Sequence, residues 1–275
     1  MAELVYPPVI ALCRLLFRAL DLKITVSGTE NVPRQGGAVL VGNHIGYPDF
    51  IFAGLACQPA GRLVRFMAKE SVFRHPVSGP LMRGMHHIPV DRAMGAESYQ
   101  LALDALRRGE IVGVFPEATI SRSFELKAFK SGAVRMARDA GVPVLPVVVW
   151  GTQRLLTKGR PAKGMRRRGV AVSIAVGEPM DVTTDPAPAM RLTTELKSRM
   201  QALLDGVQQA YPDRPRDSSD SWWLPARLGG TAPTPQEAAA LDEAARSALA
   251  GSSDPLATGN PSKTDEPRPD PRAAD

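Results

Sequence analysis

The chain has 275 residues, 44% of them hydrophobic, which is enough to bury one substantial core in one domain or at most two. Its two cysteines, Cys13 and Cys57, lack the paired spacing of a disulfide framework or a cysteine metal site, and we expect both to be reduced. Aromatic residues make up only 5% of the chain and are not interleaved with basic ones, which disfavours a stacking platform for nucleic acid.

Charge divides the chain into two parts. Residues 231–275 are rich in Pro, Ala, Ser and acidic residues and hold eight acids against four bases. Apart from a short Ala-rich stretch near residues 235–249 they have little apolar periodicity, which predicts a largely disordered acidic tail. The first 230 residues hold 30 bases against 20 acids and so carry a net charge of +10. A surface this basic attracts phosphate groups on nucleic acid, on an anionic bilayer or on a soluble cofactor, and charge alone does not distinguish among them.

An apolar stretch at residues 9–20 comes first along the chain and has the period of an amphipathic helix. Seven apolar positions share one helical face: Val9, Ile10, Leu12, Cys13, Leu16, Phe17 and Leu20. The stretch is too short and too charged to cross a bilayer, which takes about 20 apolar residues, and no basic start or cleavage site indicates a secretory signal. The helix either lies in the plane of a membrane or packs on a core. We assign residues 1–22 to peripheral or monotopic association with the cytoplasmic face of a membrane.

Short β-rich runs alternate with runs of helical period over residues 23–230, which predicts an α/β domain with a mostly parallel mixed sheet flanked by helices. The expected strands are residues 22–26, 38–42, 63–68, 111–115, 144–150 and 170–176. The expected helices include residues 49–56, 97–108, 131–140 and 190–210. Gly109 and Gly141 follow two of these helices, as C-terminal caps do.

A histidine and an aspartate lie five residues apart where the strand at 38–42 runs into a turn and then a helix. The turn can bring the Asp49 carboxylate onto the ring of His44, where it would fix the tautomer, stabilise the charged ring and leave the other nitrogen to take a proton from an alcohol. On its own, this spacing is also that of a loop histidine beside the capping aspartate of a helix.

Four short blocks follow one another in a fixed order over roughly residues 35–180. They are Asn43, His44 and Asp49 (Asn-His-x4-Asp); residues 87–92, after Gly84 and ending in Arg92; residues 115–119 (Phe-Pro-Glu-Ala-Thr); and the Pro-bracketed run 142–147. In these blocks the sequence resembles the glycerolipid acyltransferase family, which includes the 1-acylglycerol-3-phosphate acyltransferases. The resemblance implies that His44 and Asp49 are the catalytic pair. The fourth block is expected to be a structural strand.

The resemblance and the local chemistry together indicate a substrate-binding set. Its members are Asn43, Arg92, Glu117, Ala118, Thr119, Arg122 and Lys130. The planar guanidinium of Arg92 can grip a phosphate bidentately, or can pair with Asp91. The third block follows a buried strand, where open α/β sheets hold ligands, although a Pro-initiated turn with a capping Thr has the same sequence. The bases that precede the helix at 131 can converge on one anion with free backbone amides, or form a solvated loop.

The third block departs from the family pattern at two positions. Ala118 stands where the family has Gly, and a positive φ at that position would cost a methyl-bearing residue on the order of 1 kcal/mol. Ile120 stands where many members have Arg. These departures point to an altered grip on the phosphate of the acceptor and leave the acyl-transfer chemistry in place.

Two surface features are compatible with a bilayer. Residues 158–168 hold six bases, each of which could contribute about 1 kcal/mol near an anionic membrane or could simply solubilise a loop. Trp222 and Trp223 could lie at a bilayer interface or pin the chain end to the core.

The expected chemistry is direct acyl transfer, with His44 as general base and Asp49 orienting it, since no Gly-x-Ser-x-Gly nucleophile elbow is present. The resemblance implies acyl-CoA or acyl carrier protein as co-substrate and a lysophospholipid, foremost lysophosphatidate, as acceptor. We expect no other cofactor, no metal and no nucleic-acid partner. Two alternatives remain: a non-catalytic phospholipid-binding protein on the same scaffold, and a metal-dependent hydrolase that uses His44 and Asp49 with some of His75, His86 and His87.

Overall fold

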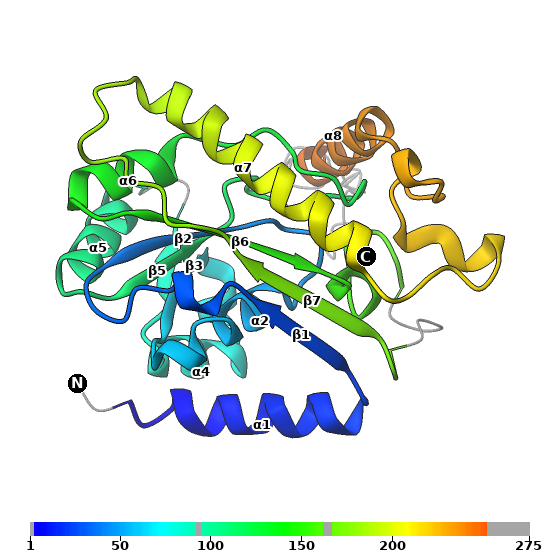
Figure 1. The fold of residues 1–275 in the computed structure, drawn as a ribbon, viewed down its shortest axis with the longest axis horizontal. Coiled ribbons are helices and arrows are strands. Elements are labelled where there is room, and N and C mark those ends of the chain that lie inside the picture. Colours follow the sequence, from blue (N-terminus) through cyan, green and yellow to red (C-terminus); the bar gives the residue numbers. More distant parts are fainter. Residues whose placement is uncertain (1–2, 92–94, 162–166, 252–275) are drawn as a thin grey trace, which may run out of the picture. The chain divides into compact units, whose positions relative to one another are not determined.

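A computed structural model describes residues 3–91, 95–161 and 167–251 of the chain (Figure 1). Residues up to Pro235 form one compact unit, and the residues from Gln236 onward belong to another. The first unit is built on a seven-stranded sheet in the order β1-β7-β6-β2-β5-β3-β4. The strands are β1 (Lys23–Ser27), β2 (Ala38–Gly42), β3 (Val64–Lys69), β4 (Ile88–Val90), β5 (Ile111–Val114), β6 (Val144–Trp150) and β7 (Ala171–Val176).

All neighbouring strands run parallel except β6 and β7, so the prediction of a mostly parallel mixed α/β sheet is confirmed. Every expected strand is present. The short edge strand β4 was not predicted, because three residues around Pro89 carry too little pattern.

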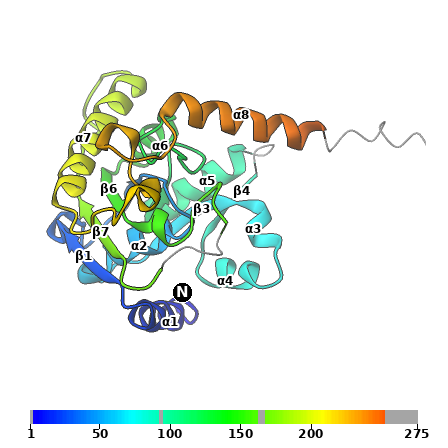
Figure 2. The ribbon, with the colours of Figure 1, turned by 90° about the vertical axis from the view of Figure 1, so that its right-hand side faces the viewer.

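Helices cover both faces of this sheet. Those of the first unit are α1 (Tyr6–Ala19), α2 (Asp49–Leu55), α3 (Glu70–Arg74), α4 (Ser78–Gly84), α5 (Gly95–Arg107), α6 (Gly132–Ala140) and α7 (Ala189–Ala210). The four expected helices of the core correspond to α2, α5, α6 and α7. Gly141 ends α6 with a φ of 68°, a conformation that glycine adopts without steric cost, as its predicted capping role requires. Figure 2 shows α3 near the β4 edge of the sheet, in contact with β3 and β4, and α4 beside α3.

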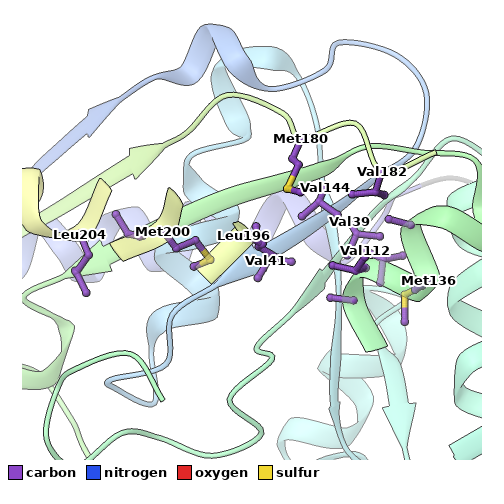
Figure 3. Close-up of a cluster of buried hydrophobic side chains, with 14 of the residues drawn as sticks. Val39, Val41, Val112, Met136, Val144, Met180, Val182, Leu196, Met200 and Leu204 are labelled. Carbon is purple, nitrogen blue, oxygen red and sulfur yellow. The ribbon is translucent and has the colours of Figure 1, made fainter. Parts of the chain in front are cut away.

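The central strand β2 shows how the two faces are filled. All five of its residues are buried, as expected of a parallel strand covered on both sides. Val39 and Val41 point to the face covered by α5, α6 and α7, where they join Leu196 and Met200 of α7 (Figure 3). Leu40 points to the opposite face, which α2 covers. The sheet is therefore a rigid platform whose strand ends hold the loops in place.

Helix α1 packs on the α2 side of the sheet. Phe17 stacks on Phe52 of α2 with ring centroids 4.8 Å apart, and the Tyr6 hydroxyl donates to the Val64 carbonyl at 2.8 Å. Leu12 and Leu16, which the helical period placed on the face of Phe17, are instead 66% and 53% exposed. The helix thus packs on the core along one edge and leaves leucines in solvent. No helix among the described residues is long and apolar enough to cross a membrane.

The segment predicted as a disordered tail contains a helix. α8 spans Pro235–Gly251, so the prediction for residues 231–275 is corrected over this range. Seven of its 17 residues are alanine, the strongest helix former, and this propensity was underestimated beside the low apolar periodicity. Residues 252–275 lie outside the described residues.

Candidate active site

Three loops meet at one edge of the sheet. β2 lies between β5 and β6 and runs parallel to both, so the carboxyl ends of the three strands are adjacent. The turn at residues 43–48 follows β2, the loop at residues 115–130 follows β5, and residues 151–158 follow β6. Open α/β sheets hold ligands at this edge.

The turn after β2 brings His44 and Asp49 into contact. Nδ1 of His44 lies 2.9 Å from Oδ2 of Asp49, the first residue of α2. The carboxylate is fully buried, whereas the imidazole is 21% exposed. An ionised carboxylate only accepts hydrogen bonds, so the ring proton is on Nδ1 and the lone pair is on Nε2. This is the arrangement of a general base whose orienting partner is shielded from water.

The Asp49 carboxylate also shapes the turn itself. Its Oδ2 accepts the backbone N–H of Ile45 at 2.7 Å and that of Gly46 at 2.8 Å. The side chain therefore caps the free amides that precede α2 while it orients the imidazole. One carboxylate therefore makes both the contacts of a helix cap and the contact with His44.

The loop after β5 fixes the histidine from the other side. The His44 ring stacks on Phe115, with centroids 4.4 Å apart, and the His44 carbonyl accepts the Ser121 N–H at 2.7 Å. Oε1 of Glu117 accepts the backbone N–H of His44 at 2.9 Å, and its Oε2 accepts that of Lys127 at 3.2 Å. The backbone and the ring of the histidine are thus held by the loop that follows β5.

Glu117 was predicted to bind substrate, but both of its carboxyl oxygens are used within the protein. Burial raises the pKa of this carboxyl to about 8, although the two backbone donors offset part of the effect. The side chain therefore ties the first block to the third. The neighbouring Ala118 is exposed and has a φ of 60°, the strained conformation that its place in a glycine position implied.

Asn43 was also predicted to contact substrate, and the structure gives it another position. It is fully buried, its Nδ2 donates to the Val149 carbonyl at 3.0 Å, and its Oδ1 accepts the Val149 N–H at 2.7 Å. The amide thereby joins the end of β2 to β6, beyond the last β2–β6 backbone pairing. Asn43 positions the turn that carries His44.

Cationic side chains lie beside the third block. Nζ of Lys158 is 3.4 Å from Oγ1 of Thr119, and the guanidinium of Arg122 lies against Gly159, where a Cβ would be 2.1 Å from Nη1. The expected positions Thr119 and Arg122 are therefore close to a lysine that the sequence placed only in a basic cluster. Lys130 is exposed, while Arg92 lies outside the described residues.

Two arginines of the basic cluster at 158–168 contact other residues of the protein. The Arg160 guanidinium lies 4.2 Å from the ring centroid of Trp222, and Nε of Arg167 donates to the Leu155 carbonyl at 2.7 Å. Trp223 is buried in the core, so the packing interpretation holds for this tryptophan.

An apolar pocket of about 210 Å³ lies between α1, α2 and α4. Its lining is mostly apolar and comes from those helices: Tyr6, Val9, Ile10, Cys13, Phe17, Phe50, Ile51, Leu55, Leu81, Met82 and Met85. A series of ring contacts joins it to the site, from His44 to Phe115 at 4.4 Å, on to Phe66 at 6.0 Å, and on to Phe50 at 5.8 Å. The packed edge of α1 therefore forms one wall of a pocket that three successive ring contacts link to His44.

The remaining histidines do not assemble around His44. Nδ1 of His87 accepts the Phe66 N–H at 3.0 Å in a buried setting, and His75 accepts from the backbone of its own loop. Within residues 3–91, 95–161 and 167–251, no group of three or more His, Cys, Asp or Glu side chains is placed to hold a metal ion.

Comparison with known proteins agrees with this geometry. The family model described as Acyltransferase matches residues 23–150. A 1-acyl-sn-glycerol-3-phosphate acyltransferase of Bacillus subtilis is 30% identical over 161 residues, which cover 57% of this chain and 73% of that protein. The chain belongs to the glycerolipid acyltransferase family.

Other relatives of this chain carry the same description. A 1-acyl-sn-glycerol-3-phosphate acyltransferase of Borreliella burgdorferi is 32% identical over 143 residues, 50% of this chain and 55% of that protein. The chain spans about half the length of several relatives, including the chloroplastic LPAT1 of Arabidopsis thaliana, of which it covers 49%. The crystal structure of PlsC, the 1-acyl-sn-glycerophosphate acyltransferase of Thermotoga maritima, shares the fold, with a TM-score of 0.62 over 75% of this chain and 81% of that chain at 23% identity.

Two residues of the site were not predicted from the acyltransferase sequence. Lys158 was noted only for its charge, and Thr152, whose hydroxyl lies 2.5 Å from Oδ1 of Asp49, was not singled out at all. Both follow the fourth block, beyond residue 150, where the family model ends. Both residues follow the carboxyl end of β6 and meet the other site residues only when the sheet has formed, so no local pattern marks them.

Proposed function

We propose that this chain transfers a fatty acyl group from acyl-CoA or acyl carrier protein to the free hydroxyl of 1-acylglycerol 3-phosphate, giving phosphatidate. The observation that carries the proposal is the contact of 2.9 Å between His44 and a fully buried Asp49 at the carboxyl edge of the sheet. The descriptions of the relatives support the choice of acceptor and donor.

The proposed reaction is a direct transfer. Nε2 of His44 takes the proton of the acceptor hydroxyl as its oxygen attacks the thioester carbonyl, and Asp49 stabilises the imidazolium that forms. The tetrahedral intermediate collapses as the C–S bond breaks, and the imidazolium returns its proton to the thiolate. One C–O bond replaces one C–S bond, and no covalent acyl-enzyme is required.

The surroundings of the pair support a phosphorylated, acylated acceptor. Lys158 and Arg122, beside Thr119, supply positive charge for the phosphate, and Arg92 is proposed as a further phosphate ligand. The apolar pocket behind Phe50 suits an acyl chain.

Membrane association is proposed for the exposed edge of α1. Leu12, Leu15 and Leu16 are at least half exposed there, and Arg14 and Arg18 add charge that suits an anionic cytoplasmic leaflet. An in-plane helix would hold the pocket next to the lipid that supplies the acceptor.

An acceptor panel tests the proposal. The purified full chain is incubated with one radiolabelled acyl-CoA and, separately, with lysophosphatidate, glycerol 3-phosphate, monoacylglycerol or no acceptor. We expect labelled phosphatidate from lysophosphatidate and at least tenfold less product from monoacylglycerol, which lacks the phosphate. Strong transfer to glycerol 3-phosphate instead would reassign the acceptor. Absence of transfer to every acceptor would contradict the proposal and favour a non-catalytic lipid-binding protein.

A further inference from the structure

The two oxygens of the Asp49 carboxylate have different partners. Oδ2 serves His44 and the two turn amides, whereas Oδ1 accepts the hydroxyl of Thr152 at 2.5 Å. Asp49 and Thr152 are both 0% exposed, so water does not replace either partner. Among the described residues, the Thr152 hydroxyl is the one group that donates a hydrogen bond to Oδ1.

Thr152 is itself held firmly at the end of β6. Gly151 reverses the chain with a φ of 101°, and a Cβ there would be 2.2 Å from the Ala171 carbonyl oxygen, so only glycine fits. The Gly151 N–H donates to Oε1 of Gln153 at 2.9 Å, and Nε2 of Gln153 donates to the Trp223 carbonyl at 3.1 Å. Both neighbours of Thr152 are therefore anchored to the core.

The residues that follow Thr152 grip the catalytic turn from outside. The Tyr47 N–H donates to the Leu156 carbonyl at 3.0 Å, and the Thr157 hydroxyl donates to the Ile45 carbonyl at 2.7 Å. A Cβ at Gly46 would lie 3.0 Å from the carbonyl oxygens of Thr152 and Leu156, so the two segments are in close contact. Residues 152–157 therefore hold the turn that carries His44 in place.

We propose that Thr152 is a positioning residue that fixes the plane of the Asp49 carboxylate and, through it, the tautomer and direction of the His44 ring. The terminal torsion of an aspartate is broad when nothing restrains it. A carboxylate bound at both oxygens cannot turn about that torsion, so Oδ2 stays in line with Nδ1 of His44. This inference rests on the proposed function and adds to it a residue outside the four sequence blocks.

Thr152→Val is the main test, because valine keeps the shape of threonine and removes its hydroxyl. We expect kcat to fall about 10- to 100-fold, in line with the cost of misplacing a catalytic group by part of an ångström, while KM for both substrates changes less than about threefold. Thr152→Ser, which restores the hydroxyl, should recover kcat to within about threefold of the wild type. Thr152→Ala serves in place of the valine variant if that variant does not fold.

The control is Thr193→Val in α7, where a buried threonine hydroxyl donates to the Ala189 carbonyl at 2.7 Å, away from the site. This variant loses a comparable buried hydrogen bond and should keep the wild-type kcat. If Thr152→Val keeps a wild-type kcat, or if the serine variant falls as far as the valine variant, the inference is wrong.

A second readout does not depend on turnover. In protein labelled with ¹⁵N-histidine, the His44 resonances should report a proton on Nδ1 in the wild type and in Thr152→Ser, and a mixture of tautomers in Thr152→Val. Unchanged histidine spectra in the valine variant would overturn the inference even if the proposed acceptor were wrong. Absence of transfer by the wild type would count against the proposed function alone.

Discussion

Two histidines of this chain, one after the carboxyl end of a strand and one before the amino end of another, have opposite hydrogen-bonding states. His44 follows the carboxyl end of β2 and donates from Nδ1 to the Asp49 carboxylate, so its lone pair is on Nε2. His87 precedes β4, and its Nδ1 accepts the Phe66 N–H at 3.0 Å, so the neutral ring carries its proton on Nε2. The lone pair of His87 is therefore already used in holding β3.

The surroundings explain why only one of these rings is suited to proton transfer. Burial and the nearby charge of Arg65 lower the pKa of His87 to about 4, which keeps the ring neutral and structural at neutral pH. Arg65 is itself fixed by Glu3, Glu110 and the Met85 carbonyl. His44 has a carboxylate partner and an exposed edge instead. The partner of Nδ1 therefore decides whether Nε2 of each ring carries a lone pair or a proton.

The largest expected effect comes from removing the carboxylate charge beside His44, which leaves this ring, like His87, without an anionic partner on Nδ1. In Asp49→Asn, the amide oxygen in place of Oδ2 still accepts the Ile45 and Gly46 N–H groups, but the neutral side chain no longer stabilises the imidazolium. We expect kcat to fall on the order of 10²- to 10⁴-fold, the range of general-base catalysis. Asp139→Asn, at an exposed position that bonds Tyr99, is the control and should keep full activity. Activity of Asp49→Asn within tenfold of the wild type would break the comparison.

A smaller effect is expected from moving the turn without changing its chemistry. In Gly46→Ala the new Cβ meets backbone oxygens of Thr152 and Leu156 at 3.0 Å, so the turn must shift by a few tenths of an ångström. We expect kcat to fall roughly tenfold. Gly132→Ala, at the start of α6 with no atom within 4 Å of the added Cβ, should leave kcat unchanged. Steady-state kinetics of the two variants decide this, and equal rates would contradict the tight packing of the turn.

A third effect concerns the pH dependence of stability, rather than turnover, and is centred on His87. Its pKa is about 4 in the folded protein and 6.5 when unperturbed, so between these values the unfolded state binds more protons. The contribution of the neutral ring to stability is present above pH 6.5 and is lost as the pH falls toward 4. Between pH 7.5 and 5 the loss is roughly 2 kcal/mol.

Urea unfolding at these two pH values measures this loss. His87→Asn keeps an acceptor for the Phe66 N–H but does not titrate, so its unfolding free energy should vary less between pH 7.5 and 5 than that of the wild type. The same pH dependence in both proteins would contradict the structural role assigned to His87.

The sequence predicted the elements with strong local patterns and the residues with local partners. The strand 38–42 and the pair His44 and Asp49, five residues apart, were found because pattern and contact are both short in range. Asn43 and Glu117 were assigned to substrate, since their true partners, Val149 and the amides of His44 and Lys127, become adjacent only when the sheet forms.

Long-range contacts account for most of what the sequence did not reveal. Thr152 meets Asp49 across 103 residues of chain, so no spacing rule could have found it. The exposure of Leu12 and Leu16 depends on which edge of α1 meets Phe52, which the helical period does not determine. Local pattern thus predicted the architecture and the contact between His44 and Asp49, while the residues that hold these two in place required the three-dimensional structure.

The most direct test of the account compares two matched variants in one assay. Thiol release from acyl-CoA in the presence of lysophosphatidate is measured for His44→Asn and His87→Asn at neutral pH. We expect His44→Asn to release no thiol above background and His87→Asn to stay within about tenfold of the wild type. Turnover by His44→Asn, or an equal loss in both variants, would contradict the claim that the ring paired with Asp49 is the base.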